Sequence, residues 1–368
     1  MSTQQFTFAP ANPRVIPKQK QIRFLVVGLG HIGRRHAALI AAHGEAEVVA
    51  ICDPLAAGAL NWPVGVDKST PHFTSLEEVL SGGPPADVAC ICTPNGLHAP
   101  QAIRCLAAGL HVVIEKPLAL NTVEAKAIIT AAKRAKRQVF GVMQNRYSPA
   151  SAWLKSQLEN QALGRILQVH LSCFWNRDHR YYTLPPDGRP HPWHGDTKLD
   201  GGVLFTQFAH FIDLLCWGFG PVKVHAARFA NQNHEDLHLF ADSGTIHFSL
   251  GEGTLGSLNF STVIWDRNFE STLTVIGSRG TIKLGGQYMN EVRYCHVEDL
   301  DMPDLPASNP ANNYGPYTGS AANHHFVIDN VVDVLKGRAE VATTAEEGLA
   351  VVRVIEDIYA LGKLENGQ

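Results

Sequence analysis

Three glycines have the spacing of a dinucleotide-binding turn. The apolar run FLVV at residues 24–27 leads into Gly28, Gly30 and Gly33, and a helical pattern follows them. In such a turn the first glycine makes the bend, the second lets the backbone approach a pyrophosphate, and the third permits close helix packing. An ordinary turn between a strand and a helix remains the alternative for the glycines taken alone.

An acidic residue follows at the distance that a nicotinamide dinucleotide site requires. Asp53 follows the strand-like run VVAIC and lies twenty residues beyond Gly33. Its carboxylate would accept hydrogen bonds from the adenosine ribose and repel a 2'-phosphate, and the next two residues bring no cation to offset that repulsion. The turn and Asp53 together predict NAD(H) rather than NADP(H). His31 and Ile32, at the start of the helix, would offer backbone amides to the phosphates.

Two further segments carry polar side chains at the predicted carboxyl ends of strands. They are Thr93-Pro94-Asn95 with His98, and Glu115-Lys116-Pro117. Ligands of open α/β sheets bind at these strand ends, so both segments are expected to face the cofactor. Each tripeptide alone is also an ordinary turn, in which Lys116 would lie on the surface.

A histidine in an apolar helix is the candidate base. Removing a hydride from a carbon that bears a hydroxyl requires a partner that accepts the hydroxyl proton. His210 lies in an apolar helical pattern at 203–217, and its reference pKa near neutrality suits both the basic and the acidic form. Periodicity alone favours a core histidine at this position, so both interpretations stay open at this point.

The segments that must position these residues change character after residue 143. Before it, short apolar runs alternate with helical patterns, which indicates parallel βαβ units. After it, the sequence predicts a loop of Pro, Gly and aromatic residues at 176–202 and glycine-punctuated strands from 222 to 292. We therefore expect a tail at 1–19, an α/β Rossmann domain with a doubly wound parallel sheet at 20–143, and an α+β domain with a large open, mainly antiparallel sheet at 144–368.

Capping patterns mark the starts of three of the expected helices. Ser75, Asn121 and Thr344 are each followed three residues later by a glutamate. In this pattern the first side chain accepts a hydrogen bond from a free backbone amide of the helix start. The last of these helices closes the chain.

The composition is typical of a globular protein in a reducing compartment. The 368 residues include 45% hydrophobic and 18% charged residues with a formal charge of -3, so no nucleic-acid surface is indicated. Seven cysteines lack the paired spacing of a zinc site, and no apolar run fits a signal peptide or membrane span. We expect a cytoplasmic protein without a membrane partner. No metal is expected, because no carboxylate or cysteine stands at ligand spacing from His191, His194, His324 and His325.

With these motifs, the sequence resembles the glucose–fructose oxidoreductase, inositol dehydrogenase and rhizopine-catabolism family (Gfo/Idh/MocA). The likeness covers nearly the whole chain after the tail, from the glycine turn and Asp53 to the helix around His210 and the glycine-rich second half. It implies a Rossmann domain followed by an open-faced sheet that often builds oligomer contacts, with substrate held between the two. It also implies that Lys116 lies in the active site, often beside a cis bond to Pro117.

A narrower likeness is to one branch of the UDP-N-acetylglucosaminuronate 3-dehydrogenases, which serve bacterial surface-polysaccharide biosynthesis. The segments that carry it are MQNR at 143–146, FWNR at 174–177, Tyr181-Tyr182, Asp200-Gly-Gly202, Thr206-Gln207 through His210, and 274–283. The chain departs from the wider family at Thr206, where many members carry an aspartate and the nucleotide-sugar branch can carry asparagine. This departure removes one possible proton acceptor from any Asp–His relay.

The resemblance implies a division of roles. His210 would be the base, and Lys116 would hold the substrate hydroxyl and stabilise negative charge on its oxygen. Gln144 is expected at the cofactor, Gln207 could position a ring hydroxyl, and Asp213 could either orient the imidazole or cap a neighbouring element. Arginines suit carboxylate or diphosphate and aromatic rings stack on sugar or uracil, although a packed loop is the alternative. The expected substrate contacts are Lys116, Asn145, Arg146, Trp175, Arg177, Tyr181, Trp193, Gln207 and His210.

These expectations favour an NAD-dependent enzyme that oxidises a nucleotide-activated uronic sugar at C3. An inositol-type polyol or free-sugar dehydrogenase is the second interpretation, favoured by a pocket too small for a uridine diphosphate. A non-catalytic NAD-binding regulatory protein is the third, and the presence of both Lys116 and His210 argues against it. We expect a homo-oligomer, a tetramer or dimer, because both alternating sets of side chains in the strands at 222–292 contain many apolar residues.

Overall fold

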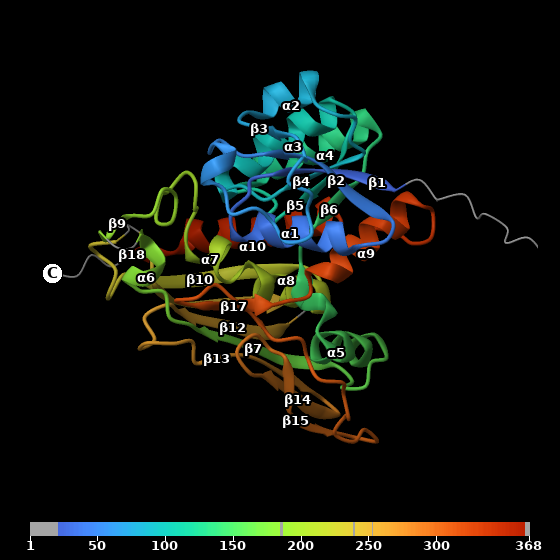
Figure 1. Ribbon diagram of the computed structural model, residues 1–368. Coiled ribbons are helices and arrows are strands. Elements are labelled where there is room, and N and C mark those ends of the chain that lie inside the picture. Colours follow the sequence, from blue (N-terminus) through green and yellow to red (C-terminus); the bar gives the residue numbers. More distant parts are fainter. Residues whose placement is uncertain (1–20, 185–186, 238–239, 252, 365–368) are drawn as a thin grey trace, which may run out of the picture.

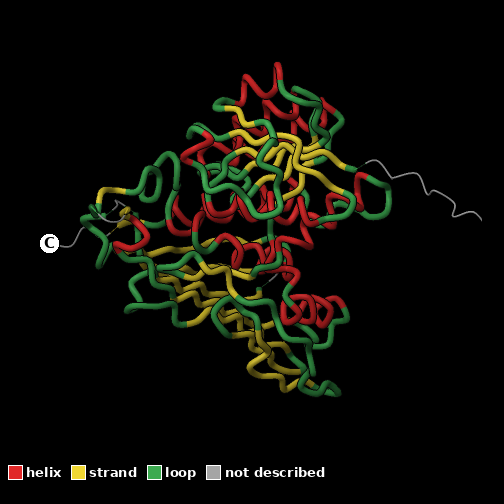
Figure 2. Tube along the Cα trace, viewed as in Figure 1, coloured by secondary structure: helices red, strands yellow, loops and turns green. Residues whose placement is uncertain are grey.

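The computed structural model describes residues 21–184, 187–237, 240–251 and 253–364. The tail expected at 1–19 lies outside the described residues. The helices and strands form two sheet layers, one above the other in Figure 1, and Figure 2 shows the strands of both in yellow with red helices between them.

The upper layer is a six-stranded parallel sheet in the order β3-β2-β1-β4-β5-β6. Its strands are β1 (Ile22–Val27), β2 (Ala46–Cys52), β3 (His72–Phe73), β4 (Val88–Ile91), β5 (His111–Ile114) and β6 (Val139–Gly141). The chain builds outward in one direction as far as β3 and then restarts at β4 on the other side of β1. The carboxyl ends of β1 and β4 therefore flank the crevice in which doubly wound sheets bind ligands. This confirms the expected Rossmann fold.

Helices cover both faces of this sheet, and two of them, α2 (Leu76–Gly82) and α4 (Thr122–Ala135), begin where the capping patterns predict. The others are α1 (His31–Ala42) and α3 (His98–Ala107). The side chains of Ser75 and Asn121 accept hydrogen bonds from the backbone amides of Glu78 and Glu124. The start of α10 (Ala345–Leu361) carries a complete capping box between Thr344 and Glu347. Short-range polar contacts thus fix three helix starts, as predicted.

The lower layer is an eight-stranded sheet in the order β15-β14-β13-β7-β12-β11-β10-β18. Its strands are β7 (Ile166–Phe174), β10 (Val222–Ala230), β11 (Ser243–Leu250), β12 (Thr254–Ser261), β13 (Glu270–Gly277), β14 (Gly280–Gly285), β15 (Glu291–Val297) and β18 (Lys363–Leu364). The pairs β7–β12 and β10–β18 are parallel and the others antiparallel, so the prediction of a mainly antiparallel sheet is confirmed. Smaller elements are α5 (Pro149–Glu159), α6 (His179–Tyr182), α7 (Val203–Thr206), α8 (Ala209–Phe219), β16 (Ala311–Asn313) and β17 (Thr318–Ala321).

The last two helices tie the two layers together. Helix α9 (His324–Leu335) contacts α1, and its residues Val327 and Val331 join the core that contains Phe24. Helix α10 contacts α4 of the first domain as well as α8 and β10 of the second. Both helices, drawn in red, lie between the layers in Figure 1. The boundary expected at residue 143 stays a prediction. The structure adds that α9 packs into the core around Phe24, and that α10 packs into the core to which both domains contribute.

Two features bear on the setting of the protein. Within the described residues, no helix is both long enough and apolar enough to cross a membrane. All seven cysteines are free thiols, and five of them are buried.

Candidate active site

The glycine turn has the geometry that a dinucleotide requires. Gly28 has a φ of 86°, and a Cβ there would lie 2.9 Å from the backbone of Cys92. A Cβ on Gly33 would lie 1.9 Å from the carbonyl oxygen of Gly28, so only glycine lets the helix approach the turn. A Cβ on Gly30 would meet nothing within 4 Å, which leaves room beside the N-terminus of α1. That open space fits a pyrophosphate against the amides that begin at His31 and Ile32.

Asp53 is anchored to the turn that it follows. Its Oδ2 accepts a hydrogen bond from the amide of Leu29 at 2.7 Å, and its Oδ1 accepts one from the amide of Leu55 at 3.0 Å. The side chain is buried, and these described partners are backbone amides rather than cations. Each carboxylate oxygen keeps a second lone pair that suits a ribose hydroxyl.

His98 braces the two strand-end segments against each other. Its Nδ1 lies 2.7 Å from the carbonyl oxygen of Pro117 and its Nε2 lies 2.8 Å from that of Thr93. Both ring nitrogens are therefore engaged with backbone, while Pro94 leads into the short turn that precedes α3. The bond between Lys116 and Pro117 is cis, as the resemblance implies.

Asn95 reaches from the same turn into the second domain. Its side-chain amide donates to the carbonyl oxygen of Asp200 and to Oγ1 of Thr206, both at 2.8 Å. The cofactor-side turn and the loop that enters α7 are therefore joined by a buried hydrogen-bond network.

Lys116 contacts the turn that leads into the helix of His210, and its charge acts on that imidazole. The Nζ of Lys116 donates to the carbonyl oxygen of Thr206 at 2.7 Å. Burial lowers the pKa of Lys116, while Glu115 and Asp200 act to raise it. Burial, together with the charge of Lys116, lowers the pKa of His210 to about 3. A neutral imidazole thus lies near an ammonium group, the pairing expected for a proton acceptor beside a group that stabilises an alkoxide.

Gln144 covers the imidazole from the side of the first domain. Its side-chain nitrogen lies 3.1 Å from Nε2 of His210, so the imidazole accepts and carries its own proton on Nδ1. That Nδ1 and the Oε1 of Gln144 are both buried without a partner among the described residues. Polar atoms in this state indicate a site that a ligand completes.

Arg177 is buried near the start of α8 and has no acidic partner among the described residues. Its Nε donates to Oε1 of Gln207 at 2.8 Å, and its other bonds go to Asn268 and to backbone carbonyls. Its guanidinium carbon lies 4.8 to 5.5 Å from the ring centres of three aromatic side chains, Trp175, Tyr181 and Tyr317. Burial lowers its pKa. A cation held in this way suits an anionic ligand group.

Arg146 has a different environment, although it was expected, like Arg177, to contact the substrate. It forms two bonds with Asp213, at 2.6 and 2.8 Å, and one with Glu347 at 2.7 Å. Its guanidinium also lies 5.3 Å from the ring centre of Trp217, on the outer side of α8. The structure does not bring this group together with Lys116 and His210. Of the two roles considered for Asp213, it supports the contact with a neighbouring element.

The remaining expected substrate residues divide between core and loop. Trp175 is buried and donates from Nε1 to Oγ of Ser271 at 2.9 Å, so its ring is part of the core. Tyr181 stacks on His194, with ring centres 4.0 Å apart, and the half-buried Trp193 packs edge-on against the same histidine. Asn145 donates to Oγ of Ser320 at 3.0 Å. The rings of Tyr181, His194 and Trp193 thus pack together in the loop, with Tyr181 next to Arg177.

Comparison with known proteins decides the family. The family model described as "Oxidoreductase family, NAD-binding Rossmann fold" matches residues 22–142, and the GFO/IDH/MocA C-terminal domain model matches residues 152–283. The chain belongs to the GFO/IDH/MocA family. It is therefore an NAD-dependent oxidoreductase.

Individual relatives cover most of the chain. The crystal structure of the WlbA dehydrogenase from Bordetella pertussis, in complex with NADH and UDP-GlcNAcA, is 30% identical with a TM-score of 0.78, and the match covers 93% of this chain and 96% of that one. Inositol 2-dehydrogenase of Rhizobium meliloti is 24% identical over 91% of this chain and 95% of its own length. Oxidoreductase P35 of Formosa agariphila is 26% identical, over 57% of this chain and 63% of that protein.

Sequence reasoning missed a buried cluster of His36, Glu115 and His324 behind the cofactor cleft. Nε2 of His36 lies 2.7 Å from Oε1 of Glu115, and Nε2 of His324 lies 3.6 Å from the same oxygen. Burial opposes charge on both groups, yet the contacts with Cys90 and Glu115 raise the pKa of His36 to about 10, and the contact with His36 lowers that of Glu115 to about 2. Glu115 is thus held in an ion pair at the base of the cleft.

This cluster corrects one step of the metal argument. The sequence offered no carboxylate near His324, but folding brings Glu115 and His36 to it, and the thiols of Cys90 and Cys92 lie 3.6 Å apart beside His36. Sequence spacing could not reveal this grouping, because its members come from four separate elements. The direct bond between His36 and Glu115 accounts for their charges as an ion pair, and the absence of a metal stays a prediction.

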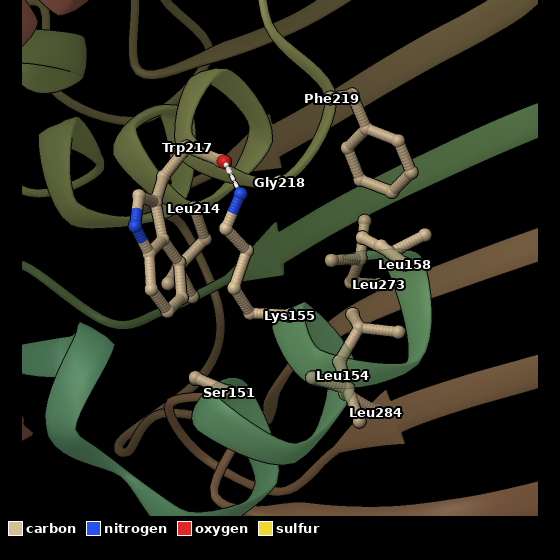
Figure 3. A pocket seen from close by; sticks show the side chains of 10 residues that line it. All are labelled: Ser151, Leu154, Lys155, Leu158, Leu214, Trp217, Gly218, Phe219, Leu273 and Leu284. Atoms are coloured by element: carbon tan, nitrogen blue, oxygen red, sulfur yellow. Dashed lines mark hydrogen bonds between the residues drawn. The ribbon is translucent and has the colours of Figure 1, made fainter. Parts of the chain in front are cut away.

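One hollow outside the cleft is apolar. Figure 3 shows a pocket between α5 and α8, where Nζ of Lys155 donates to the carbonyl oxygen of Trp217 at 2.9 Å. Apart from Lys155 and Ser151, the side chains around it are chiefly apolar, including Leu154, Leu214 and Phe219. None of the expected site residues lines this pocket, so it is separate from the site described above.

Proposed function

We propose that this protein uses NAD to oxidise the C3 hydroxyl of a nucleotide sugar of the UDP-N-acetylglucosaminuronate type. The observation that carries the proposal is that the Lys116 ammonium, bonded to the carbonyl oxygen of Thr206, lies near enough to the neutral His210 imidazole for its charge to lower the pKa of that histidine. The likeness to a WlbA dehydrogenase structure that holds NADH and UDP-GlcNAcA supports the choice of substrate class.

The residues divide the proton chemistry between them. Bound NAD, held by the glycine turn and Asp53, supplies the hydride acceptor. The substrate hydroxyl replaces Gln144 at Nε2 of His210 and gives its proton to that nitrogen. Nζ of Lys116 donates to the substrate oxygen and stabilises the negative charge that develops as the proton leaves. The hydroxyl thus loses one proton to His210 while its carbon loses one hydride, which balances the conversion of an alcohol to a ketone.

Arg177 supports a substrate that carries a carboxylate. Its cation is fully desolvated, and its described partners are neutral oxygens and aromatic rings. An arginine in this condition gains most from a carboxylate or phosphate oxygen. Since Nε of Arg177 is bonded to Gln207, three residues before His210, an acidic group held there would be close to the base.

An inositol-type or free-sugar dehydrogenase is the second candidate. The alignment with inositol 2-dehydrogenase over nearly the full length of both chains favours it. The two candidates differ at Arg177, because an uncharged polyol gives that cation no partner. We place the enzyme in the cytoplasm, as a homo-oligomer in surface-polysaccharide biosynthesis; these are parts of the proposal.

A direct assay separates the candidates. UDP-N-acetylglucosaminuronate, UDP-N-acetylglucosamine and myo-inositol are offered side by side with NAD, and NADH absorbance is followed during the first turnover so that slow cofactor release cannot conceal the chemistry. We expect reduction with the uronate and at least about tenfold less with UDP-N-acetylglucosamine, which lacks the carboxylate, the scale of one charged hydrogen bond. Reduction by myo-inositol alone would favour the second candidate.

A further inference from the structure

We propose that Asp200 is a positioning residue for catalysis, which acts through Thr206 to hold Lys116 in place and in its charged form. The inference rests on the proposed chemistry of Lys116, and it does not depend on which sugar is oxidised. The sequence analysis gave Asp200 only as part of a family likeness and assigned it no role.

The contact between Asp200 and Thr206 is short and buried. Oγ1 of Thr206 lies 2.5 Å from Oδ1 of Asp200, and the aspartate is 3% exposed. Because Asn95 donates to the same hydroxyl oxygen, the single hydroxyl proton is free to point at the carboxylate. The amides of Gly195 and Gly202 also donate to Asp200, at 3.0 and 3.2 Å. Burial raises the pKa of Asp200, whereas these three donors and the charge of Lys116 act to lower it, so they favour the ionised carboxylate.

The same threonine carries the hydrogen bond to the catalytic lysine. The carbonyl oxygen of Thr206 accepts from Nζ of Lys116 at 2.7 Å. Fixing the Thr206 side chain therefore fixes the backbone oxygen that holds the lysine. Two hydrogen bonds, both made by Thr206, thus connect Asp200 to the ammonium group.

Asp200 is the second of two carboxylates that act to raise the pKa of Lys116, after Glu115. Glu115 and Asp200 favour the ammonium, while Arg177 opposes it. Glu115 is already paired with His36, whereas Asp200 accepts only from neutral donors among the described residues. The histidines that feel the charge of Lys116 are His98, His194 and His210, and each has a lowered pKa, so they remain neutral. Removing the Asp200 charge would therefore leave Glu115, which is already paired with His36, as the remaining carboxylate that favours the half-buried ammonium.

This arrangement explains how the chain functions with threonine at position 206. Here the negative charge comes from Asp200, six residues earlier, and the Thr206 hydroxyl connects it to the same turn.

The test is Asp200→Asn, a change that removes charge and keeps shape. We expect kcat to fall by about tenfold or more and the limb of the kcat/KM profile that reports Lys116 to move to lower pH, with the affinity for NAD within about twofold. The matched control is Asp196→Asn, because Asp196 accepts backbone amides in the same loop without touching Thr206. It should leave the profile unchanged.

Rescue and an activity-independent measurement complete the design. Asp200→Asn combined with Thr206→Asp returns a carboxylate to this turn and should restore the Lys116 limb of the kcat/KM profile toward its original pH.

An NMR titration of isotope-labelled lysines measures the Lys116 pKa without activity, with the Lys116 signal assigned by its loss in Lys116→Met. It should show a lower pKa of Lys116 in Asp200→Asn even if no tested sugar is oxidised. An unchanged Lys116 pKa overturns the inference, as does a variant that loses thermal stability while keeping the wild-type pH profile. If Asp200→Asn does not fold, Thr206→Val should lower kcat severalfold with NAD affinity unchanged, and a wild-type kcat there also overturns it.

Discussion

Two buried arginines of the second domain, Arg146 and Arg177, are alike in sequence and opposite in environment. Arg146 lies between the carboxylates of Asp213 and Glu347. Arg177 is surrounded by aromatic rings and neutral oxygens, with no carboxylate among its described partners. Burying a charge is unfavourable unless an opposite charge compensates for it. The charge of Arg146 is therefore compensated within the fold, whereas we propose that an anionic ligand group compensates the charge of Arg177.

The largest expected effect concerns the compensated arginine. Arg146→Met leaves Asp213, which is 1% exposed, without its cation, so the free energy of unfolding should fall by about 3 to 5 kcal/mol. Urea denaturation measures the change. In the double variant Arg146→Met with Asp213→Leu, part of the loss should return, because no buried charge is left unpaired. A single variant as stable as the wild type would remove the distinction between the two arginines.

The next effect is catalytic and concerns His210, which lies in the chain between the partners of the two arginines, Gln207 and Asp213. His210→Asn should lower turnover by about a hundredfold or more, the scale of a lost general base, while NAD binding remains intact. Thr206→Ala should cost far less, because a threonine hydroxyl does not accept a proton at neutral pH. First-turnover kinetics and NADH fluorescence titration separate rate from binding. Wild-type turnover in His210→Asn contradicts the mechanism.

The uncompensated arginine should influence substrate rather than stability. Arg177→Met should raise the KM for the acidic nucleotide sugar by about thirtyfold, the scale of a lost charged hydrogen bond, and leave the free energy of unfolding nearly unchanged. Arg177→Lys keeps the charge and should recover part of the affinity without the planar geometry of the guanidinium. Steady-state kinetics and urea denaturation are measured on the same samples. A large loss of stability with an unchanged KM would make Arg177 a structural residue like Arg146.

The features that the sequence predicted depend on short separations along the chain. The glycine turn, the helix caps at Ser75 and Thr344 and the strand-end segments are each set by residues within a few positions of one another. Local sterics and backbone hydrogen bonding decide such geometry, so the pattern carries the structure. The expected Rossmann fold and mainly antiparallel sheet followed from the same local patterns.

The roles that remained open depend on long separations. Arg146 and Asp213 are 67 positions apart, and His36 and Glu115 are 79 apart. Nothing in the peptide around either arginine indicates which one meets a carboxylate, and nothing near His324 indicates that Glu115 lies beside it. Asp200 is within six positions of Thr206, but its role needs Lys116, 90 positions from that threonine. Only the fold joins these groups.

The smallest expected effect concerns Asp53, a buried anion of the first domain that can be compared with Arg177. Asp53 is a buried carboxylate whose described side-chain partners are the backbone amides of Leu29 and Leu55. Like Arg177, it has a charge that the fold does not neutralise, and its free lone pairs suit the ribose hydroxyls of NAD. An uncompensated charge at the cleft should again act on the ligand more than on the fold.

Asp53→Ser should therefore weaken NAD binding by about fivefold to tenfold, the scale of one lost hydrogen bond, and weaken NADP binding less or strengthen it, because repulsion of the 2'-phosphate disappears. Binding of both cofactors is measured by isothermal titration calorimetry in the wild type and the variant. Asp53→Asn is the matched control: it removes the charge and keeps the shape and one acceptor oxygen, with an NH2 donor in place of the other oxygen, so it should change NADP binding more than NAD binding. Equal affinities for the two cofactors in the unmodified protein would contradict the assignment, since the same carboxylate would then discriminate nothing.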